Sequence, residues 1–219
     1  MILAESAIYP FIKDYKTSFE IVTFKKNALI LRASEENRYI WFLLEGEVRV
    51  VACSSNGKRI VVDEIPPGCF VGHLSNLFGQ NFYTDSIAVT KCTLLQIPIE
   101  SFLQLMQEIE FSRFFYLKVT NRLYIMYKKD LAKHLFSQQE QLAYHLLECS
   151  HGSTLCMMQS LYKTCEYLRM SRRNLYNILD SFIAEGALSR TEDGQIRIEN
   201  LELIEEKARP VADFVNNQI

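Results

Sequence analysis

The first hundred residues contain short hydrophobic runs separated by turn residues, and each run is rich in β-branched or aromatic side chains. Such runs are typical of β-strands. They cover residues 21–24, 28–31, 39–44, 47–52, 59–64 and 93–97. Strands at this close spacing predict a sandwich or a jelly-roll β-barrel.

One hairpin is predicted within this block. Residues 48–53 and 58–62 are strand-like, and they flank the segment Ser54-Ser55-Asn56-Gly57. Asn-Gly favours a tight turn because both residues accept the positive φ angles that such a turn requires. Further turn residues mark positions where strands must end or bend, namely Gly46, Pro66-Pro67-Gly68 and Gly72.

After Pro98 the hydrophobic residues recur every three or four positions, which is the spacing of an α-helix. A short helix is expected first, with Phe102, Leu105, Met106 and Ile109 on one face. A longer helix is predicted from about residue 111 to residue 136, a stretch that holds neither Gly nor Pro. At 1.5 Å per residue it is about 39 Å long, which is more than a small domain needs.

The length of this second helix favours a partner helix. Phe115, Val119, Leu123 and Met126 recur at spacings of three and four, and we expect them to form the interface of a symmetric, coiled-coil-like homodimer. The alternative is a core helix that lies along its own barrel.

The remaining residues predict three further helices, the last two of which are joined by a very short turn. A helix over 138–149 ends before Gly152, and helices over 161–168 and 171–185 are separated by Arg169-Met170. Ser171 is a favourable N-cap, and two strands then flank the turn residues Thr191-Glu192-Asp193-Gly194. This order is a winged helix-turn-helix. We therefore predict an α+β chain with a barrel at residues 1–109, a dimerisation helix at 110–137 and a winged domain at 138–219.

Composition and charge exclude several classes of protein. The chain has 219 residues, of which 48% are hydrophobic and 23% charged, so it is neither disordered nor fibrous. Its 24 basic and 26 acidic residues exclude a generally basic surface but leave room for a local basic patch. Its apolar runs are short and its first residues lack a basic leader, so we expect a cytoplasmic protein without a membrane partner. Six cysteines without a C-x-x-C pair predict neither a disulfide framework nor a zinc site.

The candidate chemistry lies at the start of the second helix of the helix-turn-helix, which enters the major groove of DNA with its first turn against the base edges. That turn reads Ser171-Arg172-Arg173-Asn174. Arginine can donate two hydrogen bonds to guanine or to phosphate, and asparagine can read adenine. The expected DNA-binding residues are Ser171, Arg172, Arg173, Asn174, Asn177, Tyr162, Lys163 and Arg169. The alternative is a solvated helical face that happens to carry two arginines.

The motifs of the second half carry a family resemblance. They read Cys165-Glu166-Tyr167-Leu168, Met170-Ser171-Arg172, Leu175-Tyr176, Ile178-Leu179 and Glu185-Gly186-Ala187-Leu188. With the glycine-punctuated first half and the long helix, the chain resembles the CRP/FNR family of bacterial transcription regulators over nearly its whole length. The resemblance implies a cyclic-nucleotide-binding-like sensor barrel, dimerisation through the long helix and binding of double-stranded DNA by the winged domain.

The resemblance also implies a symmetric DNA site with half-sites about 34 Å apart, and contact with RNA polymerase if the protein is an activator. Ser171 and Arg172 match the family's phosphate-binding and base-reading pair. The next position, often glutamate in the family, is Arg173, and a further common arginine is replaced by Asn177. The DNA sequence recognised should therefore differ from that of the cAMP receptor protein.

The sensor half departs further from the family pattern. In its cyclic-nucleotide binders a Gly-Glu pair holds the ribose and a downstream arginine segment holds the phosphate. Here glutamate is replaced by His73, no Arg or Lys lies between His73 and Thr90, and Asp85 repels a phosphate. We expect that cAMP is not the effector and that no cofactor or metal is bound. The candidate pocket residues, for an unidentified effector, are Gly72, His73, Phe82, Tyr83 and Thr84.

Two alternatives for the function stay open. In the first alternative, the winged domain acts through protein contacts. In the second, oxidation of Cys149, Cys156 or Cys165 controls DNA binding. An enzyme is not expected, because the four histidines are scattered and the chain has neither a phosphate-binding loop nor the residue order of a Ser-His-Asp triad.

Overall fold

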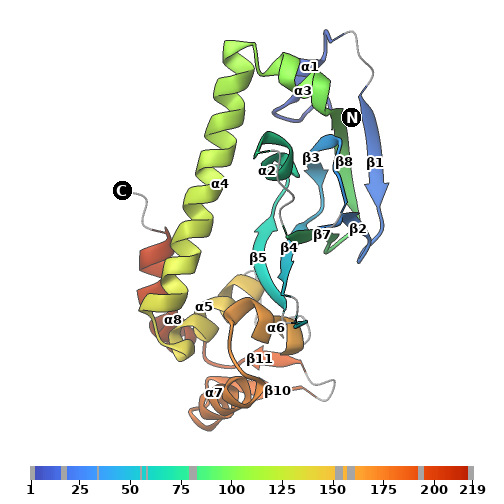
Figure 1. Cartoon of the computed structure of the whole chain (residues 1–219). Coiled ribbons are helices and arrows are strands. Elements are labelled where there is room, and N and C mark those ends of the chain that lie inside the picture. The colour runs from blue at the N-terminus through green and yellow to red at the C-terminus, as the bar shows by residue number, and fades with distance from the viewer. Residues whose placement is uncertain are drawn as a thin grey trace. The chain divides into compact units, whose positions relative to one another are not determined.

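The computed structural model describes residues 3–15, 19–33, 35–54, 56–57, 59–78, 83–150, 155–156, 161–191 and 195–216. The chain divides into two compact units, Met1–Leu123 and Tyr124–Ile219. Their border falls within the long helix α4, Ile109–Leu135, which is drawn in green and yellow in Figure 1. None of the described helices is both long enough and apolar enough to cross a membrane.

The first unit is the predicted β-barrel. Its strands are β1 Glu20–Phe24, β2 Leu29–Leu31, β3 Tyr39–Glu45, β4 Val48–Cys53, β5 Arg59–Ile65, β6 Phe70–Val71, β7 Thr84–Ala88 and β8 Cys92–Pro98. They form two four-stranded sheets with the orders β1-β8-β3-β6 and β2-β7-β4-β5, in which neighbouring strands are antiparallel. Six of these strands were predicted. The other two, β6 and β7, have weak signals, because β6 has two residues and β7 begins with Thr-Asp-Ser.

Three short helices and the first part of α4 complete this unit. They are α1 Tyr9–Ile12, α2 His73–Phe78 and α3 Ile99–Leu105. Strand β3 is buried on both faces, because a hydrophobic cluster covers each of them. Trp41 and Leu43 join the hydrophobic cluster that draws on both sheets. Ile40, Phe42 and Leu44 join a second cluster, with side chains from α1, α3 and α4.

The placement of Phe115 corrects the predicted dimer interface. Its side chain is 1% exposed, and its ring centroid lies 5.0 Å from those of Phe70 and Phe102. Val119 packs against the same cluster. Because the barrel's own side chains enclose Phe115, assigning it to an interface between two copies was wrong. Over this part of α4, the alternative of a helix packed on its own barrel is correct.

The predicted hairpin joins β4 to β5, and Cys53 pairs with Arg59 at its end. Gly57 has φ +79° and its N–H donates to the carbonyl of Ser54 at 2.9 Å. Gly46, between β3 and β4, also has a positive φ, and a Cβ there would lie 2.4 Å from the carbonyl oxygen of Lys91. Any side chain at residue 46 therefore forces the backbone apart.

The second unit contains the end of α4 and a winged helix-turn-helix. Its elements are α5 Gln138–Ser150, β9 Leu155–Cys156, α6 Leu161–Leu168, α7 Arg172–Ala184, β10 Leu188–Arg190, β11 Ile196–Ile198 and α8 Leu201–Asn216. The three strands pair in the order β10-β11-β9. The Asp193-Gly194 turn that was expected between β10 and β11 lies outside the described residues.

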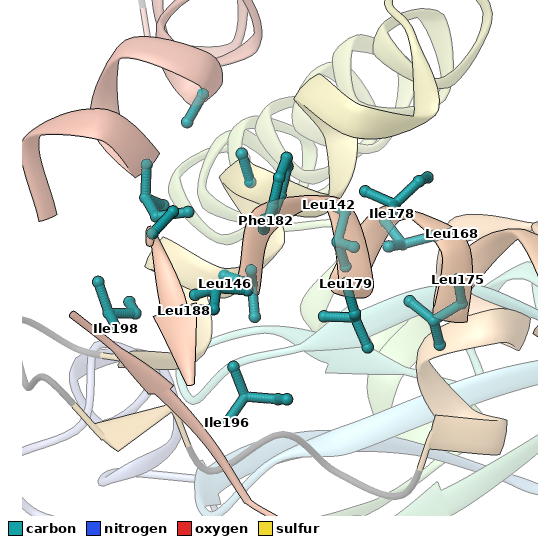
Figure 2. Packing of buried hydrophobic residues seen from close by; sticks show 14 of the residues in the cluster. Leu142, Leu146, Leu168, Leu175, Ile178, Leu179, Phe182, Leu188, Ile196 and Ile198 are labelled. Atoms are coloured by element: carbon teal, nitrogen blue, oxygen red, sulfur yellow. The ribbon is translucent and has the colours of Figure 1, made fainter. Parts of the chain in front are cut away.

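One hydrophobic core holds this unit together. Leu175, Ile178, Leu179 and Phe182 project from α7 toward Leu142 and Leu146 of α5, and Leu188, Ile196 and Ile198 close the cluster from the wing (Figure 2). Helix α6 adds the buried Leu168 to this core, and its Leu161 and Cys165 pack against it while only partly buried. Since one face of α7 is committed to this core, its other face is presented to solvent.

Candidate nucleic-acid interface

The start of α7 is fixed by its N-cap. Ser171 is extended, with φ −72° and ψ 151°, and its hydroxyl accepts a hydrogen bond from the N–H of Asn174 at 3.2 Å. Met170, 6% exposed, joins the core just before the cap. Arg169 completes the turn with φ +54°, a conformation that costs a non-glycine residue about 1–2 kcal/mol. The turn thus sets where α7 begins and which side chains its first turn presents.

The solvent face of α7 carries most of the predicted DNA-binding side chains. Arg172, Arg173 and Asn177 are exposed, whereas Leu175 and Ile178 face the core. The guanidinium of Arg172 lies 5.4 Å from the ring centroid of Tyr162 in α6, which is itself 48% exposed. A cation at this distance from an aromatic ring is attracted to its face. The ring of Tyr162 in α6 therefore orients Arg172 at the start of α7.

Two predicted residues are engaged elsewhere. Asn174 is half-buried, and its amide donates to the side-chain oxygen of Gln138 in α5. Nη2 of Arg169 lies 2.9 Å from Oδ1 of Asp130 in α4. Each of these two side chains thus has a polar partner within the second unit, and its contact with DNA stays a prediction. Lys163 is half-buried on α6.

The wing contributes two arginines that the sequence reasoning missed. Arg190, at the end of β10, has Nη2 2.6 Å from Oδ1 of Asp180 in α7, and its guanidinium lies 5.7 Å from the ring of Tyr176. Arg197 is exposed in β11. Tyr176 and Asp180 share the exposed face of α7 with Arg173 and Asn177. The basic surface thus extends from α7 onto the wing, and the basic residue in each predicted wing strand was the available signal.

The predicted effector pocket is only partly described. Gly72 has φ +80° and precedes His73, the first residue of α2. Burial lowers the pKa of His73 from 6.5 to about 4, although the nearby backbone of Phe70 opposes this shift. Its Nδ1 atom is buried without a hydrogen-bond partner, and its ring meets Phe115 edge-on at 5.8 Å. His73 is therefore a neutral side chain packed beside α4.

The other pocket candidates lie nearby in sequence but differ in environment. Tyr83 is 80% exposed, Thr84 is half-buried, and Phe82 lies outside the described residues. Oδ1 of Asp85 accepts the backbone N–H of Ala33 at 3.0 Å. The carboxylate of Asp85 is thus bound to the backbone just after β2. Among the described residues, no three His, Cys, Asp or Glu side chains gather into a metal site.

The cysteines of the second unit give limited support to redox control. Burial raises the pKa of Cys165, and the nearby Arg172 offsets only part of that effect. A thiol with a raised pKa is a poor nucleophile. Sγ of Cys149 lies 3.5 Å from Nε2 of His145, and the side chain of Cys156 lies outside the described residues.

The described elements thus define a β-barrel, a long helix and a winged helix-turn-helix whose exposed face carries arginines. Residues 21–109 match the family model of the cyclic nucleotide-binding domain. A curated relative, Regulatory protein YeiL of Escherichia coli O157:H7, is 21% identical over 196 residues, which are 89% of this chain and 89% of that protein.

Solved structures share the fold. A protein of the CRP/FNR family from Eubacterium rectale has a TM-score of 0.78 at 17% identity, covering 93% of this chain and 94% of that one. A CRP/FNR-family transcriptional regulator from Thermus thermophilus has a TM-score of 0.70 at 20% identity, covering 87% and 98%. The chain shares the fold of these two proteins.

Proposed function

We propose that this protein is a homodimeric, sequence-specific DNA-binding transcription regulator. The observation that carries the proposal is the first turn of α7, where Arg172 and Arg173 are exposed beyond a capped N-terminus. In a helix-turn-helix this turn meets the base edges of the major groove, where an arginine fork recognises guanine. Asn177, one turn further on, extends the same exposed face.

The proposed dimer forms through the exposed side of α4. Tyr116, Leu117, Leu123, Tyr124 and Tyr127 are each between 48% and 62% exposed. Tyr116 and Leu123 are seven residues apart, as are Leu117 and Tyr124, and Tyr127 follows Leu123 by four, so all five lie along one side of the helix. Leu123 is the predicted interface residue that this surface retains, and Met126 is half-buried. Two copies joined in this way present two α7 helices to a symmetric DNA site.

The proposed effector is not cAMP. His73 replaces the acidic residue expected after Gly72, and it is neutral and buried rather than free to hold a ribose. The carboxylate of Asp85, bound to the N–H of Ala33, repels a phosphate at the position where the resemblance requires one to bind. Gly72, His73, Tyr83 and Thr84, with Phe82, remain the proposed lining for a different molecule. If the protein is an activator, RNA polymerase is its further partner.

The test is selection of duplexes from random oligonucleotides by the purified, reduced protein without added ligand. Recovery of a two-fold symmetric sequence supports the proposal, and Arg172→Ala should relax the preference at one base pair in each half-site. A folded dimer that enriches no sequence, with or without oxidant and with cell metabolites present, contradicts it and favours a winged domain that acts by protein contacts.

A further inference from the structure

An acidic residue lies on the face of α7 that the proposed function turns toward DNA. Asp180 is exposed and shares this face with Arg173 and Asn177, two turns beyond the first arginine. A carboxylate in that position opposes the approach of a polyanion. In the structure its charge is neutralised by Arg190 of the wing, whose Nη2 atom lies 2.6 Å from Oδ1.

The arginine in this pair has a second support. The guanidinium of Arg190 lies 5.7 Å from the ring centroid of Tyr176, one turn before Asp180 on the same helix. The aromatic ring keeps the cation at the junction of α7 and β10 whether or not the carboxylate holds it. Arg190 is therefore positioned by one contact and neutralised by the other.

We propose that Asp180 is an internal competitor of DNA phosphate for Arg190, so that this one carboxylate sets how tightly the protein binds DNA. The inference rests on the proposed function and assigns two residues that the predicted set of DNA contacts lacks. Phosphate and carboxylate oxygens accept the arginine fork in the same way, so one can replace the other. The side chains are 43% and 63% exposed, and an ion pair so open to water is weak enough to be exchanged.

The competition predicts an unusual response to substitution. Asp180→Asn frees Arg190 without removing bulk, and it should tighten DNA binding by about two- to fivefold, the factor that an exposed ion pair is worth. It should also steepen the slope of log K against log salt by about 0.9, because one more phosphate is neutralised. Both changes should appear on the selected duplex and on random DNA, since a phosphate contact carries no sequence information.

Three matched variants complete the experiment. Arg190→Gln should weaken binding and make the salt slope shallower. Asp180→Asn should gain less affinity in the Arg190→Gln background than in the wild type, because there it removes only the repulsion of the carboxylate and frees no arginine. Glu205→Gln removes one exposed negative charge from α8 of the same unit and should leave the salt slope unchanged. Unchanged thermal unfolding of each variant shows that affinity rather than folding is measured.

Specific results overturn the inference. If Asp180→Asn gains as much affinity in the Arg190→Gln background as in the wild type, Asp180 acts by plain repulsion and not by competition. If Asp180→Asn weakens binding, the carboxylate contacts DNA or supports the wing. If the wild type binds DNA through Arg172 and Arg173 while the variants at residues 180 and 190 have the same salt slope as the wild type, that outcome overturns the inference and leaves the proposed function intact. If the wild type has no affinity for DNA, both the inference and the proposed function are wrong.

Discussion

The guanidinium of Arg122 in α4 forms a bidentate ion pair with the carboxylate of Asp63 in β5. Its Nε–H donates to Oδ2 at 2.8 Å, and its Nη2 group donates to Oδ1 and to the carbonyl of Glu64. The two side chains are only 21% and 14% exposed. A β-bulge precedes this site, where the register of β4 against β5 shifts between Val50 and Val51. The ion pair ties the edge of one sheet to the long helix.

Removal of one partner of this pair leaves a mostly buried charge alone. We therefore expect Arg122→Ala or Asp63→Ala to lower the free energy of unfolding by about 3 kcal/mol. The paired replacement Arg122→Met, Asp63→Leu should recover much of that loss. Urea unfolding measures it, and a single variant as stable as the wild type would show that the pair contributes nothing.

The neutral, buried His73 predicts a pH dependence of stability. In the unfolded chain His73 takes up a proton as the pH falls below 6.5. In the folded protein it takes up a proton only near pH 4. The stability that depends on the neutral ring is complete above pH 6.5 and falls as the pH drops from 6.5 toward 4. The total loss is about 3 kcal/mol. Urea unfolding at pH 7.5, 6 and 5 should show a shallower decline in His73→Gln. His134→Gln, a substitution at an exposed side chain, is the control and should match the wild type.

Arg172 and Tyr162 should differ in what they contribute to DNA binding. Arg172→Ala is expected to cost about 1–3 kcal/mol on the selected duplex. Tyr162→Ala should cost about 0.5–1 kcal/mol, because it removes only the ring against which Arg172 rests. Binding titrations on selected and random duplexes measure both. Equal losses on the two duplexes for Arg172→Ala would identify a phosphate contact in place of base reading.

Leu123 and Phe115 belong to the same helix but should respond in opposite ways. Leu123→Glu places a charge on the exposed side of α4, so sedimentation should show a shift from dimer to monomer with stability preserved. Phe115→Ala opens a cavity among the rings of the barrel and should cost about 3–5 kcal/mol of stability. A Leu123→Glu protein that sediments as a dimer would place the interface elsewhere.

Local pattern accounts for what could be predicted from the sequence. Strand alternation, turn chemistry and the N-cap Ser171 depend on near neighbours, and the corresponding elements are present. Helix α8 was not predicted, although Leu201, Ile204, Ala208 and Val211 have helical spacing, because Pro210 interrupts the pattern. Apolar spacing within α4 could not distinguish a barrel-facing residue from a partner-facing one, which is why Phe115 was misplaced.

The polar partners of the candidate-site residues could not be predicted from local pattern. Asn174 contacts Gln138, which is 36 residues earlier in the chain, and Arg169 pairs with Asp130 of α4. Such partners are brought together by the tertiary fold and leave no local signal. The same reason explains why the pairing of Arg190 with Asp180 was missed, whereas the exposed first turn of α7 was predicted correctly.

The unbroken course of α4 also decides how this protein can be taken apart. Its 27 residues contain neither Gly nor Pro, and the border between the two compact units falls between Leu123 and Tyr124, inside the helix. Proteases cleave extended, accessible segments, and a hydrogen-bonded helix at the border offers none of the usual linker sites. A cut there leaves carbonyl groups unpaired on one fragment and N–H groups unpaired on the other. The two halves share one structural element, so neither can be isolated without dividing it.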